Sequence, residues 1–176
     1  MILFDKNVFH LKTDHYSYLF RVNDRGILEH LHFGAPVRME DAEGFLCRSG
    51  LGWGSCVVLD DNDTGSSLDD KMLEWSSSGR GDYRESPVEL GGVSADFRYT
   101  GMQIHEGIVP MESGLPQASG NGQTLEVILE QKGAKLHLYY TAFETALTRW
   151  TVLENTGDTP ITVQKLMSTC VDIPGS

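Results

Sequence analysis

A polar segment in the middle of the chain combines residue types that bind sugars. Residues 74–87 contain a tryptophan, a tyrosine, two arginines and acidic side chains among serines and glycines. An aromatic face covers the apolar C–H face of a pyranose, and charged groups form paired hydrogen bonds with its hydroxyl groups. The same residues fit a second interpretation, in which Trp75 and Tyr83 anchor the loop and the charged groups are solvated. Composition alone favours this packing interpretation and leaves the sugar contact open.

Two aspartate motifs precede this segment, and neither is complete. Asp63-Thr64-Gly65 matches the aspartic-protease signature, in which two such carboxylates share a proton. It follows polar residues instead of an apolar strand and occurs once, so a protease would have to be a homodimer. Asp60-x-Asn62-x-Thr64-Gly65 resembles the start of an EF-hand loop, but Lys71 occupies the place of its bidentate glutamate. We interpret both motifs as turns in a polar loop.

Two histidines, His30 and His32, are spaced to leave the same face of a predicted strand. They would supply part of a zinc site, yet the other four histidines have no spacing that supplies a third ligand. Gly50-Leu51-Gly52-Trp53-Gly54 lacks the spacing of a phosphate loop, and no Gly-x-Ser-x-Gly elbow occurs. We expect half-buried, hydrogen-bonded histidines, no metal and no cofactor.

The elements that must position these residues are strands. Apolar and polar residues alternate over residues 16–22 and 27–33, which are joined by the turn sequence Asn23-Asp24-Arg25-Gly26. The same alternation continues over residues 124–130, 134–143, 146–154 and 160–171. Since no window has a helical apolar stripe, we predict an all-β sandwich of two packed, mainly antiparallel sheets. Residues 59–87 form a long polar loop, which is typically functional or disordered.

Length, net charge and cysteine content limit the number of domains, the kinds of partner and the cellular compartment of the protein. The 176 residues suffice for one domain, residues 1–176, with its own core. With 14 Lys+Arg against 25 Asp+Glu, the net charge of −11 disfavours nucleic acid and anionic membranes as partners. No secretory signal and no run of about 18 apolar residues occurs. Three cysteines, Cys47, Cys56 and Cys170, favour reduced, buried thiols in a cytoplasmic protein.

One segment of the chain resembles a motif of the amino-terminal domain of microbial glycoside hydrolase family 36 α-galactosidases. This segment is Gly79-Arg80-Gly81-Asp82-Tyr83-Arg84-Glu85-Ser86-Pro87. Further matches follow in the same order along nearly the whole chain. They include the opening pattern Gly26-x-Leu28-x-His30-Leu31-x-Phe33-Gly34, then Leu147-x-Arg149, Glu154-Asn155 and Ser168-x-x-Val171-Asp172. The segment around Asp82 and the final stretch are the specific parts, and the rest is common β patterning.

This resemblance implies a β-supersandwich of the galactose-mutarotase type that precedes a (β/α)₈ catalytic barrel. Family members are retaining enzymes that release terminal α-galactose from melibiose, raffinose and stachyose with two aspartates. Their nucleophile lies in a Lys-Trp-Asp segment, which this chain lacks. We therefore expect a non-catalytic domain of a larger α-galactosidase, truncated inside the sandwich. A truncated sandwich exposes unpaired strand edges, so we also expect the chain to self-associate.

The resemblance also implies substrate contacts and partners. Family members are commonly tetramers in which loops of this domain reach the active site of a neighbouring subunit. The candidates in the corresponding loop, residues 69–84, are Asp70, Trp75, Arg80 and Arg84, with Trp75 stacking on the sugar and the charged groups binding hydroxyls. The alternatives are an autonomous carbohydrate-binding module and, far behind, the dimeric aspartic protease.

Overall fold

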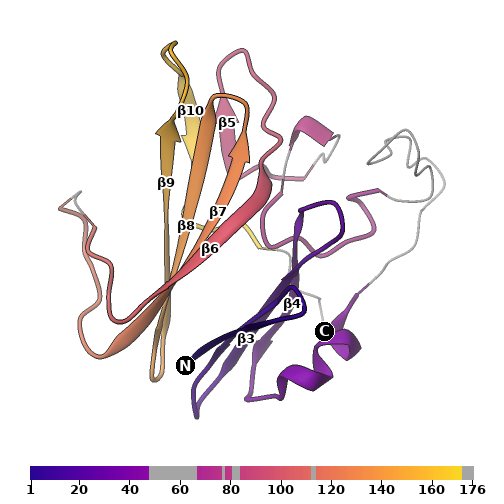
Figure 1. The fold of residues 1–176 in the computed structure, drawn as a ribbon, viewed down its shortest axis with the longest axis vertical. Helices are drawn as coiled ribbons and strands as arrows, with labels where there is room; N and C mark the ends of the chain where they lie inside the picture. The colour runs from indigo at the N-terminus through magenta and orange to yellow at the C-terminus, as the bar shows by residue number, and fades with distance from the viewer. Residues whose placement is uncertain (48–66, 77, 81–83, 112–113, 172–176) are drawn as a thin grey trace.

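Two antiparallel sheets of four strands pack face to face and form the body of the protein (Figure 1). The structure is a computed structural model that describes residues 1–47, 67–76, 78–80, 84–111 and 114–171. A third, two-stranded sheet lies at one end of the second sheet (Figure 1). The predicted all-β sandwich is confirmed. Within the described residues, no helix is both long enough and apolar enough to cross a membrane.

The first sheet is a meander with tight turns. Its strands, in spatial order, are β1 (Ile2–Asp5), β2 (Val8–Lys12), β3 (Ser17–Val22) and β4 (Leu28–Gly34). The β1–β2 turn has positive φ at both central residues, 47° at Lys6 and 65° at Asn7, which matches the twist of a two-residue hairpin. In the β3–β4 turn, Asn23 Oδ1 accepts hydrogen bonds from the backbone N–H groups of Arg25 and Ile27. The predicted first hairpin is therefore present.

The second sheet contains the longest strands. In spatial order they are β6 (Arg98–His105), β7 (Gly122–Gln131), β8 (Ala134–Phe143) and β9 (Leu147–Asn155). The last three agree closely with the ranges predicted from alternation. The two-stranded sheet pairs β5 (Val88–Leu90) with β10 (Val163–Leu166). β10 is much shorter than the predicted strand over residues 160–171, and it pairs with β5 outside the second sheet.

The main core lies between the two large sheets. Phe20 stacks on Phe9 at 4.6 Å between ring centroids and on Tyr140 at 5.1 Å, so aromatic rings from β2, β3 and β8 join the sheets. The outer face of the first sheet is also covered, because Leu19 and Leu31 pack under the 3₁₀ helix η1 (Met39–Phe45). Coverage on both faces explains why β2, β3 and the first four residues of β4 are buried almost continuously.

A β-bulge separates the two histidines of β4. His30 pairs with Phe20 and His32 pairs with Leu19, so Leu31 is an extra residue in β4. Phe20 and Leu19 point to opposite faces of β3, and so do the two imidazoles. The prediction that both leave one face is wrong, because a single inserted residue inverts the alternation.

Residues 67–76 cover the free edge of β4. The His30 N–H donates to the Met72 carbonyl at 2.9 Å, and the Glu74 N–H donates to the Leu28 carbonyl at 3.0 Å. Leu73 forms an isolated bridge with Glu29 and is 1% exposed. This part of the predicted polar loop is therefore built into the fold. A second short 3₁₀ helix, η2 (Ser78–Arg80), follows it.

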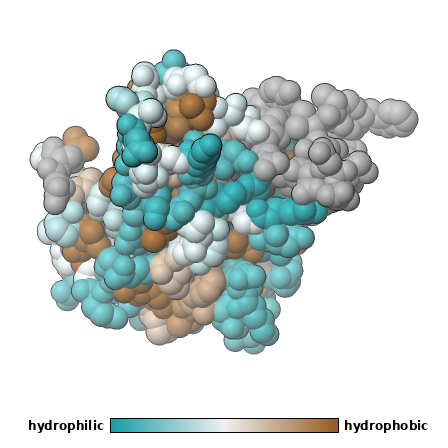
Figure 2. Space-filling view, turned by 45° about the horizontal axis from the view of Figure 1, so that its top comes forward, coloured by the Kyte–Doolittle hydropathy of each residue, from teal (hydrophilic) through white to brown (hydrophobic). Residues whose placement is uncertain are grey.

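The surface carries scattered apolar side chains. Figure 2 shows brown apolar patches separated by polar ones on the face in view. The most exposed large apolar residues of the described chain include Met1, Phe33 and Leu115, which lie in three different parts of the fold. Scattered exposure of this kind is normal for a folded domain.

The close approach of Gly79 to residue 95 gives a test of the fold. The Gly79 N–H donates to the Ala95 carbonyl at 2.6 Å, and a Cβ at Gly79 would lie 2.4 Å from that oxygen. We expect Gly79→Ala to lower the free energy of unfolding by about 1–3 kcal/mol in urea denaturation. Gly44→Ala, with nothing within 4 Å of the new Cβ, should be neutral or stabilise by about 0.4–1 kcal/mol. Equal effects of the two substitutions would contradict this packing.

Candidate functional site

The most enclosed polar group is the carboxylate of Glu74. Glu74 is 0% exposed and follows the segment that covers β4. Its oxygens accept hydrogen bonds from the hydroxyls of Tyr18 at 2.8 Å and Tyr140 at 3.0 Å. His30 Nδ1 lies 3.0 Å and Arg149 Nη1 lies 2.9 Å from the carboxylate. We call these five side chains the Glu74 network.

The Arg149 guanidinium completes the network from β9. Its Cζ lies 4.5 Å from the centroid of the Tyr140 ring, a cation–π contact. Its Nη1 donates to the Tyr18 hydroxyl at 3.1 Å and its Nη2 donates to the Tyr140 hydroxyl at 3.2 Å. Both tyrosine hydroxyls therefore accept from the arginine and donate to Glu74. This arrangement satisfies the buried charges with directed hydrogen bonds.

The charge states in the network follow from its geometry. Burial by itself would raise the pKa of Glu74, but Arg149, His30 and Tyr18 outweigh it and hold the pKa below its ordinary value. Burial and the neighbouring Glu74 carboxylate raise the pKa values of Tyr18 and Tyr140 well above 10.0, so both phenols stay protonated donors. A carboxylate enclosed in this way has no route to a substrate, so the network joins parts of the fold.

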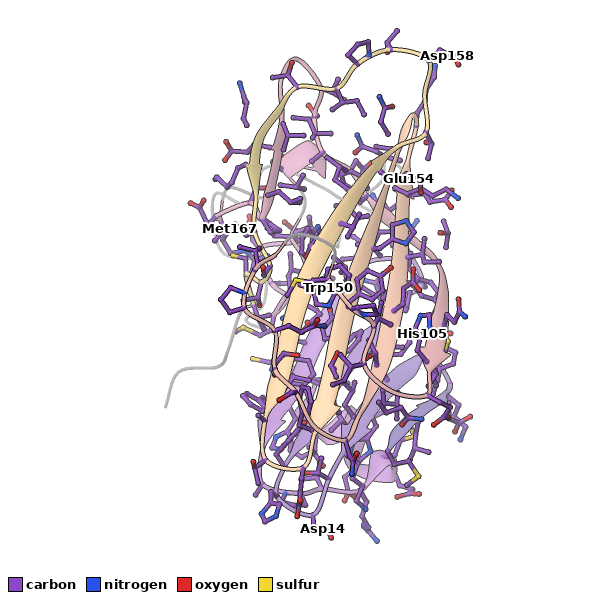
Figure 3. The ribbon with its side chains drawn as sticks, turned by 90° about the vertical axis from the view of Figure 1, so that its left-hand side faces the viewer. Asp14, His105, Trp150, Glu154, Asp158 and Met167 are labelled. Carbon is purple, nitrogen blue, oxygen red and sulfur yellow. The ribbon has the colours of Figure 1, made fainter. Side chains whose placement is uncertain are left out.

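A second polar cluster lies on the outer face of the second sheet. The Glu126 carboxylate lies 2.7 Å from His105 Nε2 and 2.7 Å from His137 Nδ1, and it accepts from the Tyr139 hydroxyl at 3.2 Å. His137 Nε2 lies 3.2 Å from Glu154. Figure 3 faces this side of the molecule and labels His105 and Glu154. Burial by itself would raise the pKa of Glu126. The hydrogen bonds from His137, His105 and Tyr139 outweigh burial and hold this pKa below its ordinary value.

The outer cluster continues into an aromatic stack. The Tyr139 ring lies parallel to Trp150 with 4.0 Å between centroids. Burial and the nearby Glu126 raise the pKa of Tyr139 to about 12. Sequence reasoning missed this cluster. The turn between β7 and β8 sets the register that places Tyr139 opposite Glu126, and the turn between β8 and β9 sets the register that places Tyr139 opposite Trp150.

The predicted substrate residues lie in different environments. Asp70 is mostly buried, with its Oδ1 2.6 Å from Lys71 Nζ. Arg84 donates to the carbonyls of Lys71 at 2.7 Å and Leu68 at 2.8 Å, so Asp70 and Arg84 meet at one turn. Trp75 is 3% exposed and belongs to the main core, the position that the packing interpretation predicts. The Arg80 backbone lies in η2, and its side chain lies outside the described part of the structure.

The remaining motifs of the polar loop lie largely outside the described residues. This applies to Asp63, to the EF-hand-like start at residues 60–65, and to Tyr83. In the described ranges, no group of three or more His, Cys, Asp or Glu side chains is placed to hold a metal ion. Cys47 and Cys170 are half-buried instead of fully buried, while Cys56 is outside the described ranges.

Comparison with known proteins identifies the family. The model of the glycosyl hydrolase family 36 N-terminal domain matches residues 26–176. The chain belongs to this family. The bifunctional alpha-galactosidase/sucrose kinase AgaSK of Mediterraneibacter gnavus is 31% identical over 96% of this chain, and alpha-galactosidase AgaA of Geobacillus stearothermophilus is 30% identical over 94%.

Solved structures of family 36 members share the fold of this N-terminal domain. The galactosidase domain of AgaSK superimposes with a TM-score of 0.87 at 28% identity and covers 97% of this chain. AgaA of Geobacillus stearothermophilus in complex with raffinose gives a TM-score of 0.81 at 30% identity over 95%. The chain spans only 19% of the AgaSK sequence and 24% of the AgaA sequence.

The Glu74 network predicts a specific dependence of stability on pH. Because the folded-state pKa of Glu74 is lowered, its contribution is present above its ordinary value of 4.5 and is lost as the pH falls through the folded-state value. We expect Glu74→Gln to lower the free energy of unfolding by about 3–5 kcal/mol at pH 7, measured by urea denaturation. The difference from the unsubstituted protein should shrink as the pH falls below 4.5.

The control for this prediction is Glu144→Gln, at a glutamate whose side chain is 83% exposed. This variant should stay within about 0.5 kcal/mol of the unsubstituted protein at every pH. A constant difference between Glu74→Gln and the unsubstituted protein from pH 7 to pH 3 would contradict the lowered pKa.

Proposed function

We propose that this chain is the non-catalytic amino-terminal domain of a retaining α-galactosidase that hydrolyses terminal α-galactosides such as melibiose and raffinose. The observation that carries the proposal is the family match together with length: the chain spans about a fifth to a quarter of relatives whose names state α-galactosidase activity. A retaining glycosidase needs two carboxyl groups about 5–5.5 Å apart beside the substrate. Among the described residues, the carboxylates of Glu74 and Glu126 are hydrogen-bonded to side chains of this domain, so we do not assign them as this pair.

The turn that Asp70 and Arg84 share is the proposed substrate-access element. Asp70 and Arg84, together with Arg80, would contact sugar hydroxyls in the active site of a neighbouring subunit of a homo-oligomer, a tetramer in the parent enzyme. Trp75 would position this turn without touching the sugar, because its buried ring fixes the segment that contains Asp70 to the core. Lys71 Nζ donates to the Ser67 carbonyl at 2.8 Å, which stabilises the same turn. We place the parent protein in the cytoplasm, with no nucleic-acid or membrane partner.

An autonomous carbohydrate-binding module is the second candidate. The observation that favours it is the Tyr139–Trp150 stack beside Glu126 and Glu154 on the outer face of the second sheet. Calorimetric titration of the chain with raffinose separates the two candidates. The main proposal predicts no detectable heat, because the substrate residues act only beside a barrel.

Hydrolysis of raffinose by the parent enzyme tests the proposed function. We expect Asp70→Asn to raise KM by about three- to tenfold with kcat nearly unchanged, because it removes a charge-assisted hydrogen bond that is uniform along the reaction. Asp158→Asn, at an exposed turn far from this segment (Figure 3), should leave both constants unchanged. Absence of any α-galactosidase activity in the parent would refute the proposed function. Equal KM values for the two variants would refute the role of Asp70.

A further inference from the structure

Lys71 is a buried lysine beside the proposed substrate residue Asp70. It is 7% exposed, and its side chain folds back over the turn of residues 67–71. Its Nζ donates to the Ser67 carbonyl at 2.8 Å and lies 2.6 Å from Asp70 Oδ1. Lysines are almost never buried to this extent unless they are paired, because an ammonium group loses much solvation on burial. The Asp70 carboxylate supplies the paired charge.

The backbone of this turn has other hydrogen bonds that hold it. The Lys71 N–H donates to the Leu68 carbonyl at 3.1 Å, and the Arg84 guanidinium donates to the carbonyls of Leu68 and Lys71. A neutral donor would bind the Ser67 carbonyl at a lower cost in solvation than an ammonium group does. The positive charge of Lys71 therefore points to a role at the Asp70 carboxylate.

The two carboxylate oxygens of Asp70 have different surroundings. Oδ1 accepts a charge-assisted hydrogen bond from Lys71 Nζ. Oδ2 forms no hydrogen bond with any described residue, and it is not buried. An ionised carboxylate only accepts hydrogen bonds. Oδ2 is therefore the one oxygen of Asp70 that the turn presents to a hydrogen-bond donor from outside.

We propose that Lys71 is a positioning residue for the substrate contact of Asp70. Its ammonium group occupies Oδ1 and fixes the plane of the carboxylate, so that Oδ2 accepts a hydrogen bond from one sugar hydroxyl. Without Lys71 the carboxylate rotates more freely, and ordering it when the sugar binds costs affinity. The pairing also excludes a contact in which both oxygens bridge two neighbouring hydroxyls. This role rests on the proposed function, because it takes Asp70 as the group that contacts sugar.

Hydrolysis of raffinose by variants of the parent enzyme tests this role. We expect Lys71→Met to raise KM by about three- to tenfold with kcat nearly unchanged, since the lost orientation weakens binding of the ground state and the transition state equally. Lys71→Arg keeps a charged donor and should recover part of this loss. Lys135→Met makes the same change at a lysine that lies 2.9 Å from Glu130 on the second sheet, and it should leave both constants unchanged.

A double variant separates the positioning of Asp70 from a general effect on the turn. Because Lys71 acts through Asp70, the combination of Asp70→Asn with Lys71→Met should raise KM no further than the larger of the two single effects. Multiplied effects, or an unchanged KM in Lys71→Met, would overturn the proposal. If Lys71→Met does not fold, Lys71→Gln, with a shorter and neutral side chain, is measured in its place and decides by the same two results.

The same measurements separate the role of Lys71 from the proposed function. A raised KM in Asp70→Asn with an unchanged KM in Lys71→Met keeps the substrate contact of Asp70 and refutes the role of Lys71 alone. An unchanged KM in Asp70→Asn refutes the substrate contact itself, and the positioning role with it. Urea denaturation of each variant enzyme checks that it is folded at the assay temperature.

Discussion

The fold depends on one buried charge pair, Glu74 with Arg149. A buried ion pair stabilises a protein only when its remaining lone pairs and protons are satisfied, because the loss of solvation is large. Here Tyr18, Tyr140 and His30 complete the set of partners. The five side chains come from β3, β4, β8, β9 and the segment that covers β4. A packing of the two sheets that separated these elements would leave a charge or a phenol without its partner.

This constraint links the interior to the proposed substrate-access turn. Glu74 fixes residues 73–75 from one side, and the Trp75 ring enters the main core beside it. The Arg84 guanidinium then stabilises the turn by donating hydrogen bonds to the backbone carbonyls of Leu68 and Lys71. Asp70 is thus presented by a segment that is anchored at both ends. A rigid scaffold below a surface turn is the usual way in which proteins position binding residues.

The sequence predicts the strands of the second sheet well because alternation there is regular and the turns have strong signals. β7, β8 and β9 agree with residues 124–130, 134–143 and 146–154 to within a few residues. The bulge at Leu31 could not be predicted, since it changes register without changing composition. The role of Glu74 was also hidden, because an acidic residue in a polar run carries no sign that Arg149, far along the chain, will meet it. In the sequence, Trp75 fits both a sugar contact and a core position, and only the structure, which buries its ring in the main core, distinguishes them.

Glu74 and Arg149 stabilise the fold together as one unit. A double-mutant cycle with Glu74→Gln, Arg149→Met and the double variant, measured by urea denaturation at pH 7, tests this most directly. We expect a coupling free energy of about 2–3 kcal/mol, because either substitution alone leaves the other charge buried and unpaired. Additive effects, within about 0.5 kcal/mol, would contradict it.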